Sequence, residues 1–245
     1  MTIERAALVE HARNSIAVGS RSFALASQLF DRTTRERAWL LYAWCRRCDD
    51  LADGQEAGHA LATPDPALGG AEAMARIAHI RDQTDKALAG QPVDDPAFAA
   101  IGQVARECAL PHHFIYDVIE GFELDAAEWR PRTEADLYQY CYHVAGAVGC
   151  LMAIVMQVDP GDEATLDRAC DLGLAFQLAN IARDIADDNA NDRCYLPIEW
   201  LVEKSLGSEE ERNVLMEALL ASGLPPALRI KVPFAATDED SPWRF

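Results

Sequence analysis

The stretch ATLDRACDLGLAFQLANIARDIADD (164–188) decides how this chain folds. Its alanines and leucines favour helix, and polar residues recur inside it every three or four positions, at Gln177, Asn180, Asp184 and Asp188. At about 100° per residue, these four side chains fall within about 40° of one another on a helix. The stretch therefore predicts a long helix over residues 162–189 whose apolar surface carries one ordered polar stripe.

The rest of the chain shows the same preference. Its 245 residues include 42 alanines but only 24 valines and isoleucines, which favours helix over sheet. Helical patterns run over residues 2–13, 33–54, 71–90, 96–109, 112–128, 134–157 and 162–189. Glycine and proline mark a surface loop at 58–70 and helix-ending turns at 90–96 and 159–161. We expect one all-α domain.

Charge and hydropathy narrow the possible partners and compartments. Forty acidic and 22 basic residues give a net charge of -18, which repels nucleic acid. The longest charge-free apolar stretch, 144–156, falls short of the roughly 20 residues of a membrane span, so it predicts a buried core helix. Residues 1–15 carry charges where a secretory signal needs an apolar run. We therefore expect no nucleic-acid partner and a cytoplasmic protein, either free or at the membrane surface.

The cysteines favour a reduced protein. There are seven, an odd number, and most of them lie inside helical patterns. Cys45 and Cys48 form a CxxC, but no second pair stands at zinc-site spacing and no strand precedes them as in a thioredoxin motif. We expect free thiols there and no metal.

A second polar stripe lies in LYAWCRRCDDLADG (41–54). On a helix, Tyr42, Arg46, Asp49 and Asp53 fall within about 60° of one another. The DxxxD spacing alone is weak evidence, because 22 aspartates produce such pairs by chance. The Asp167/Asp171 and Asp188/Asp192 pairs point away from the stripe or straddle a helix end, so we expect them to be solvated.

Two aspartates four positions apart on a helix can hold a divalent cation between them. Buried carboxylates must be paired, hydrated or metal-bound. Mg²⁺, or Mn²⁺ in its place, prefers oxygen ligands and completes its shell with water and phosphate. Arg46, Arg47 and Arg183 are then placed to bind phosphate oxygens in the bidentate way that guanidinium allows. The alternative is an internal salt-bridge network between the two helices.

The helix at 134–157 combines Tyr138, Tyr140, Tyr142 and His143 with the small residues 145–149. These small residues either open a groove for a long apolar ligand or permit close helix packing, and the sequence favours neither. His143 is typical of a satisfied core histidine, and we assign it no catalytic role.

Five stretches carry a resemblance to a known family. They are GSRSFALAS (19–27), LYAWCRRCDDLADG (41–54), YCYHVAGAVG (140–149), the stretch 164–188 quoted above and RCYLP (193–197). Together they resemble the squalene and phytoene synthase family, and most of all its bacterial phytoene synthases, over roughly residues 10 to 200. The resemblance implies a single-domain isoprenoid-synthase-type helical bundle around a central cavity.

The resemblance also implies roles for individual residues. Asp49, Asp53, Asp184 and Asp188 would bind the Mg²⁺–diphosphate groups of two prenyl substrates, with Asp50 and Asp187 auxiliary. Substrate-binding positions would be Ser22, Phe23, Tyr42, Arg46, Gln177, Asn180 and Arg183. Tyr140 and Tyr195 would line the reaction centre and act in catalysis.

The reaction that the family implies is a head-to-head condensation of two geranylgeranyl diphosphates, through a cyclopropylcarbinyl diphosphate, to phytoene in carotenoid biosynthesis. Squalene synthases add hydride from NADPH, which a phytoene synthase does not need, so we expect no NADPH. The alternatives are a squalene- or dehydrosqualene-type synthase that uses farnesyl diphosphate, and a catalytically impaired relative that acts as a scaffold.

The C-terminal residues depart from the family pattern from about 203 onward. Four prolines after Gly223 interrupt every helical pattern there. We expect the synthase-like domain to span residues 1–222 without the family's C-terminal closing helices, followed by an irregular tail at 223–245. An apolar cavity open on one side would follow.

Overall fold

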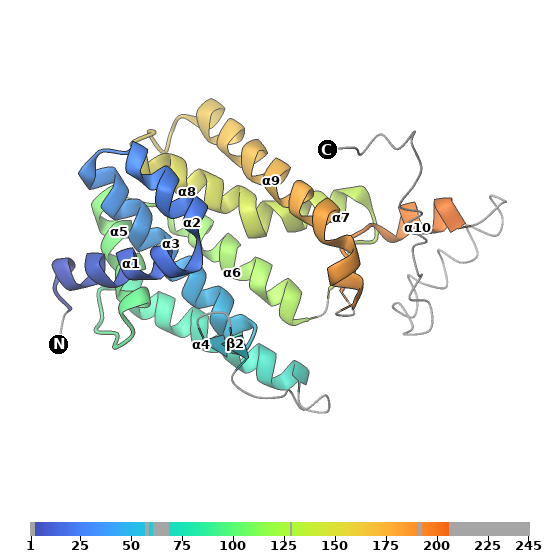
Figure 1. The fold of residues 1–245 in the computed structure, drawn as a ribbon, viewed down its shortest axis with the longest axis horizontal. Coiled ribbons are helices and arrows are strands. Elements are labelled where there is room, and N and C mark those ends of the chain that lie inside the picture. Colours follow the sequence, from blue (N-terminus) through green and yellow to red (C-terminus); the bar gives the residue numbers. More distant parts are fainter. Residues whose placement is uncertain (1–2, 57–58, 61–68, 128, 191–192, 206–245) are drawn as a thin grey trace.

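The computed structural model describes residues 3–56, 59–60, 69–127, 129–190 and 193–205, and this part of the chain is almost entirely helical, as predicted (Figure 1). The exception is a small antiparallel hairpin of β1 (Gln55–Glu56) and β2 (His59–Ala60), which follows the first acidic motif. The predicted C-terminal features, the tail at 223–245 and the missing closing helices, lie outside the described residues.

The N-terminal helices are α1 (Arg5–Gly19), α2 (Arg21–Ala26), the 3₁₀ turn η1 (Ser27–Leu29), α3 (Arg32–Ala52), α4 (Gly69–Leu88) and α5 (Pro96–Cys108). Two of them begin at aspartates that their sequences place as N-caps. Asp31 accepts hydrogen bonds from the backbone N–H groups of Thr33 and Thr34 at 2.9 and 3.2 Å, and Asp95 caps α5 ahead of Pro96.

The C-terminal helices are α6 (His112–Ala126), α7 (Glu134–Cys141), the π-helical turn η2 (Tyr142–Gly146), α8 (Ala147–Val155), α9 (Glu163–Ala190) and α10 (Ile198–Ser205). A capping box starts α7, in which Thr133 and Asp136 bond each other's backbone N–H groups. The predicted helix over 134–157 is therefore real but is interrupted by one wide turn at η2.

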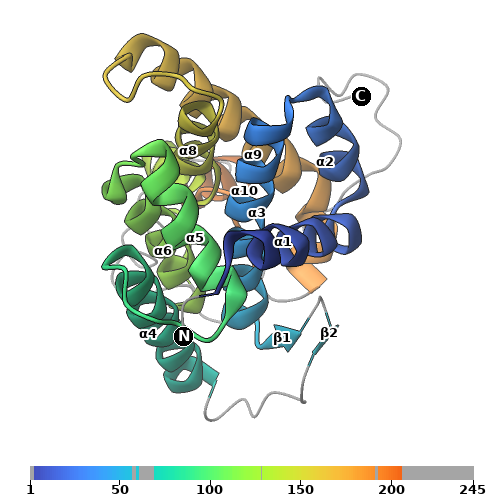
Figure 2. The same cartoon turned by 90° about the vertical axis from the view of Figure 1, so that its left-hand side faces the viewer.

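The helices form two groups that meet at α6 and α8. Helix α3 packs against α1, α4 and α5, whereas α9 packs against α7, η2 and α8. Between them, α6 contacts both α3 and η2, and α8 contacts both α3 and α9 (Figures 1 and 2). The two helices that carry the polar stripes, α3 and α9, thus share the neighbour α8, which places both stripes on one body of the protein.

The main core lies where α3, α5, α6 and α8 meet. Trp44, Phe98 and Ile119 are fully buried there. The indole N–H of Trp44 donates to the hydroxyl of Thr84 at 3.2 Å, so its polar atom is satisfied. A smaller apolar cluster surrounds Tyr140 and Ile181 and lies next to the acidic residues described below.

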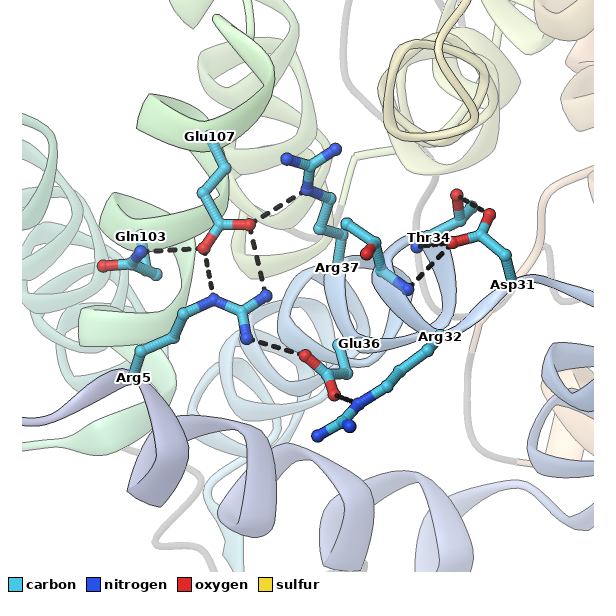
Figure 3. Close-up of polar contacts among 9 residues, drawn as sticks. Arg5, Asp31, Arg32, Thr34, Glu36, Arg37, Gln103 and Glu107 are labelled. Atoms are coloured by element: carbon cyan, nitrogen blue, oxygen red, sulfur yellow. Dashed lines mark hydrogen bonds and ion pairs between the residues drawn. The ribbon is translucent and has the colours of Figure 1, made fainter.

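An arginine–glutamate cluster (Arg5, Arg32, Glu36, Arg37 and Glu107) ties the N-terminal helices together (Figure 3). Glu107 of α5 binds Arg5 of α1 at 2.6 Å and Arg37 of α3 at 2.9 Å, and Arg5 also binds Glu36 at 2.6 Å. Because each glutamate meets two guanidinium groups, this cluster holds α1, α3 and α5 in register.

The small residues of the helix at 134–157 permit close packing on α9. A Cβ at Gly149 would collide with the carbonyl oxygen of Ala169, and one at Gly173 would collide with that of Ala145. Of the two interpretations that the sequence left open, the structure supports close helix packing here.

Some elements differ from the prediction. The first helix was predicted over 2–13 but runs to Gly19, and the short elements α2, η1 and α10 were not predicted. Helix α2 has only six residues, which is too few for apolar periodicity to reveal. Its start is set instead by Ser20, whose hydroxyl accepts a hydrogen bond from the N–H of Phe23 at 3.3 Å.

One described stretch, Glu134–Val155, is long and apolar enough by composition alone to cross a membrane. However, 56% of its most apolar window is buried inside the protein, as expected for a core helix. It is therefore weak evidence for a membrane span.

Candidate active site

The stripe on α3 presents an arginine between two aspartates. Arg46 donates to Asp49 at 3.1 Å and forms an ion pair with buried Asp50 at 2.6 Å. Burial and the neighbouring carboxylate of Asp53 raise the pKa of Asp49 to about 6. Two carboxylates are therefore held close enough to repel each other, with one guanidinium beside them.

The segment before α3 lies against the same stripe. The ring of Phe23 packs edge-on against Tyr42 with centroids 6.3 Å apart, and Ser22 lies 3.3 Å from the hydroxyl of Ser20. A Cβ at Gly19 would collide with the hydroxyl of Tyr42, so a larger residue there would have to displace the Tyr42 side chain. Phe23 remains 61% exposed.

The stripe on α9 is half-buried at Gln177, Asn180, Asp184 and Asp188, whereas Asp171 on the same helix is exposed, as predicted. Arg183 donates hydrogen bonds to both carboxylate oxygens of Asp184, at 2.7 and 2.6 Å, and these bonds lower the pKa of the Asp184 carboxyl. Burial and the charge of Asp184 raise the pKa of Asp188. The second stripe thus repeats the pattern of the first: an aspartate pair with an arginine beside it.

Arg193 joins the two stripes. It lies in the segment between α9 and α10, and its Nη2 atom forms an ion pair with Oδ1 of Asp53 at 3.4 Å. Its charge also acts on Asp188 and on Asp125. Because one guanidinium interacts with carboxylates from α3, α6 and α9, the three helices contribute to a single carboxylate site (Asp49, Asp53, Asp125, Asp184 and Asp188).

Asp125, near the end of α6, is a member of this site that the sequence analysis missed. The hydroxyls of Tyr140 and Tyr195 both donate to its carboxylate, at 3.1 and 3.0 Å. Burial raises the pKa of Asp125 although both phenols and Arg193 oppose this. The available signal was its place on the apolar face of α6, seven residues after buried Val118 and four after buried Gly121.

Stacked aromatic rings line this part of the site. Tyr140 stacks on Tyr195 with centroids 4.9 Å apart and on Trp129 at 5.6 Å. Leu137, Cys141 and Ile181 are buried beside them. The carboxylate site therefore passes directly into an apolar and aromatic wall.

Arg47 and the Cys45/Cys48 pair do not belong to the carboxylate site. Arg47, predicted to bind phosphate with Arg46 and Arg183, forms an ion pair with Asp95 at 2.7 Å and so connects α3 to α5. Cys45 and Cys48 are free thiols, and burial raises the pKa of Cys45 to about 12, which keeps that thiol protonated and a poor metal ligand.

His143 is a buried and satisfied core residue, as predicted. Its Nδ1 atom lies 3.1 Å from the carbonyl oxygen of Asp117. Asp117, Glu120 and His143 bring potential metal ligands within 4.8 Å of one another. However, the hydroxyl of Tyr142 donates to Asp117 at 2.6 Å. These hydrogen bonds satisfy Asp117 and His143 within the protein, and the exposed carboxylate of Glu120 lies 3.9 Å from the His143 Nδ1 atom.

The donor set of the carboxylate site suits a hard divalent cation. Asp49, Asp53, Asp184 and Asp188 offer only oxygen ligands, which Mg²⁺ prefers. Burial and, after it, the neighbouring carboxylates raise the pKa values of Asp49 and Asp188, and a bound cation would offset both effects. The residues present therefore fit Mg²⁺.

Comparison with known proteins agrees with this geometry. Residues 16–222 match the family model described as squalene/phytoene synthase. The chain belongs to the squalene/phytoene synthase family. Both acidic stripes and the aromatic residues Tyr140 and Tyr195 fall within the matched range.

Similar family members include named phytoene synthases. One from Pseudescherichia vulneris is 50% identical over 202 residues, covering 82% of this chain and 63% of that protein. A 15-cis-phytoene synthase from a Paracoccus species is 44% identical over 224 residues, covering 89% and 71%. The chain thus spans less than two thirds of the length of the Pseudescherichia vulneris protein.

Solved structures share the fold. A crystal structure of a dehydrosqualene synthase in complex with ligand has a TM-score of 0.66 and 25% identity, covering 89% of this chain and 73% of that one. The squalene synthase HpnC from Alicyclobacillus acidocaldarius has a TM-score of 0.68 at 25% identity, covering 87% and 75%. The expected all-α isoprenoid-synthase fold is confirmed.

Proposed function

We propose that this chain catalyses the Mg²⁺-dependent, head-to-head condensation of two geranylgeranyl diphosphates to phytoene, in carotenoid biosynthesis. The observation that carries the proposal is the meeting of the two acidic stripes at Arg193, directly beside the stacked rings of Tyr140 and Tyr195. The higher identity to phytoene synthases than to the squalene-type structures favours the longer substrate.

Asp49, Asp53, Asp184 and Asp188 are the residues we propose to hold Mg²⁺. When bound, the cation supplies charge neutralisation for a leaving diphosphate. Arg46 and Arg183 lie beside these carboxylates and would bind diphosphate oxygens. Arg193 would contribute positive charge at the same place.

The aromatic wall supplies the other half of the mechanism. Loss of the first diphosphate leaves an allylic carbocation, which the double bond of the second substrate attacks, and loss of a proton then closes the ring to give a cyclopropylcarbinyl diphosphate. A second ionisation, rearrangement and proton loss then give phytoene. Electron-rich faces of Tyr140, Tyr195 and Trp129 stabilise the cationic carbon. The adjacent apolar side chains keep water away from it.

The remaining substrate-binding residues are proposed from their places around this site. Phe23 and Ser22 on α2 would cover the first diphosphate, next to Tyr42. Gln177 and Asn180 lie on the stripe of α9, two turns and one turn before Asp184, respectively. They would face the reaction centre.

The test is incubation of purified protein with Mg²⁺ and either geranylgeranyl or farnesyl diphosphate, followed by hydrocarbon analysis. The expected product is phytoene from the geranylgeranyl substrate without NADPH. Release of only the prenyl alcohol would indicate that water reaches the cation. A hydrocarbon formed from farnesyl diphosphate alone would establish a squalene- or dehydrosqualene-type synthase instead. If neither substrate gave a product, the chain would be a catalytically impaired relative that acts as a scaffold.

We further propose that the protein works at the membrane surface, because its substrate carries a long hydrocarbon chain and its product is a hydrocarbon. Exposed apolar side chains gather around α2, with Val18 at 78%, Leu25 at 74% and Leu29 at 89% exposure. Co-sedimentation with lipid vesicles tests this, and Leu25→Asp combined with Leu29→Asp should release the protein. Equal binding of the variant would contradict the proposed surface.

A further inference from the structure

Asp125 connects the acidic and aromatic halves of the site. Its carboxylate interacts electrostatically with Asp53 and Arg193 on one side, and it accepts hydrogen bonds from Tyr140 and Tyr195 on the other. It belongs to α6, which packs against both α3 and η2. A movement of this carboxylate would therefore displace both tyrosine hydroxyls.

The contacts are specific in geometry. Tyr140 lies 3.1 and 3.2 Å from the two oxygens of Asp125, and Tyr195 lies 3.0 Å from the first of them. Because each phenol has one proton, donating it to Asp125 fixes the direction of the O–H bond. The rings are also stacked, so fixing the hydroxyls fixes the planes of both rings.

We propose that Asp125 is a positioning residue that orients the Tyr140 and Tyr195 rings toward the reacting carbon. The effect of Asp125 on catalysis rests on the proposed function, whereas its hydrogen bonds to the two tyrosines do not. A carboxylate suits this task better than a neutral acceptor, because a charged acceptor makes the stronger hydrogen bond and increases the electron density of each phenol. An electron-rich ring attracts a cation more strongly.

The chain offers a matched control on the same helix. Asp117 of α6 also accepts a hydrogen bond from a phenol, that of Tyr142, at 2.6 Å. This second pair has the same chemistry but lies two turns earlier on α6. Asp117→Asn and Asp125→Asn therefore remove the same charge from two carboxylates that accept phenol hydrogen bonds, only one of which orients the proposed catalytic rings.

Steady-state kinetics with geranylgeranyl diphosphate test the catalytic consequence. We expect Asp125→Asn to lower kcat by about 100-fold with KM changed by less than about 3-fold, and Asp117→Asn to leave both within about 3-fold of wild type. In a Tyr140→Phe, Tyr195→Phe background, Asp125→Asn should cost less than about a further 3-fold, because its partners are already gone. An additive loss would overturn the positioning role.

¹⁹F NMR of protein labelled with 3-fluorotyrosine tests the hydrogen bonds without any turnover. Single Tyr→Phe variants assign the resonances. Asp125→Asn should shift those of Tyr140 and Tyr195 and leave Tyr142 unchanged, whereas Asp117→Asn should do the reverse. If wild-type protein makes no hydrocarbon but the resonances move in this way, the proposed function fails while the positioning contacts stand. Unmoved Tyr140 and Tyr195 resonances would overturn the inference.

Discussion

The arginine–glutamate cluster and the carboxylate site are both partly buried groups of charge, yet their acids behave in opposite ways. Hydrogen bonds from Arg5, Gln103 and Arg37 outweigh burial and lower the pKa of Glu107 to about 2. Burial and Asp53 raise the pKa of Asp49 to about 6. The first group satisfies its charges with partners inside the protein. The second leaves negative charge in excess, which is useful only if a cation arrives from outside.

The largest expected effect comes from removing one carboxylate of the site. Asp49→Asn or Asp184→Asn should lower turnover of prenyl diphosphates by more than about 1,000-fold, because each removes a cation ligand. The matched control is Asp171→Asn, which changes an exposed aspartate on α9, the helix that also carries Asp184, and it should retain full activity. An Asp49 or Asp184 variant with most of its activity would remove that residue from the site.

Breaking the arginine–glutamate cluster should affect stability and not chemistry. Glu107→Gln leaves Arg5 and Arg37 without their shared carboxylate, and we expect it to lower the free energy of unfolding by about 2 kcal/mol. Because the pKa of Glu107 is lowered in the folded state, its stabilisation is present above about pH 4.5 and is lost as pH falls toward about 2.

Urea unfolding of wild type and Glu107→Gln, at pH 7 and at pH 3, measures this difference. The difference between the two proteins should be smaller at pH 3 than at pH 7. A variant as stable as wild type at pH 7 would mean that the cluster does not hold α1, α3 and α5 together.

The opposite sign is expected for Asp49 in protein without added metal. Its pKa rises from 3.8 to about 6 on folding, so ionisation costs stability as pH increases between these values. Asp49→Asn should therefore match wild type near pH 4 and exceed it by about 1 kcal/mol at pH 7, a value reduced because half of the Asp49 side chain is exposed. Thermal unfolding at both pH values tests this, and a variant less stable than wild type at pH 7 would contradict the repulsion.

The smallest effect lies at the edge of the arginine–glutamate cluster. Arg32 pairs with Glu36 at 2.8 Å, but its side chain is 85% exposed. Arg32→Ala should change the free energy of unfolding by less than about 0.5 kcal/mol, because solvent screens the pair. If Arg32→Ala lowered the free energy of unfolding as much as Glu107→Gln does, side-chain exposure would not explain the difference between the two ion pairs.

The sequence predicted the parts of the site that repeat along a single helix. The stripes of α3 and α9 follow from periodicity, since residues three or four apart share a helix face. Arg47 shows the limit of that reasoning: it is adjacent to Arg46, but neighbouring positions on a helix point about 100° apart. Arg47 therefore forms an ion pair with Asp95, the N-cap residue of α5, while Arg46 forms ion pairs with Asp49 and Asp50.

Residues that complete the site through tertiary contacts could not be predicted in this way. Asp125 becomes significant only because α6 lies beside η2 and brings it to Tyr140. Arg193 stands in a segment without helical periodicity, 140 residues along the chain from Asp53. The π-helical turn at η2 was also missed, because the sequence pattern of 134–157 reads as one continuous helix.

Isothermal titration calorimetry with inorganic pyrophosphate tests most directly whether the aspartate pairs of α3 and α9 form one cation-dependent diphosphate site. A chain with a net charge of -18 should not bind this anion alone. We predict binding only when Mg²⁺ is present, and its loss in both Asp49→Asn and Asp184→Asn but not in Asp171→Asn. Binding of equal strength without Mg²⁺, or binding that survives either of the first two substitutions, would contradict the account.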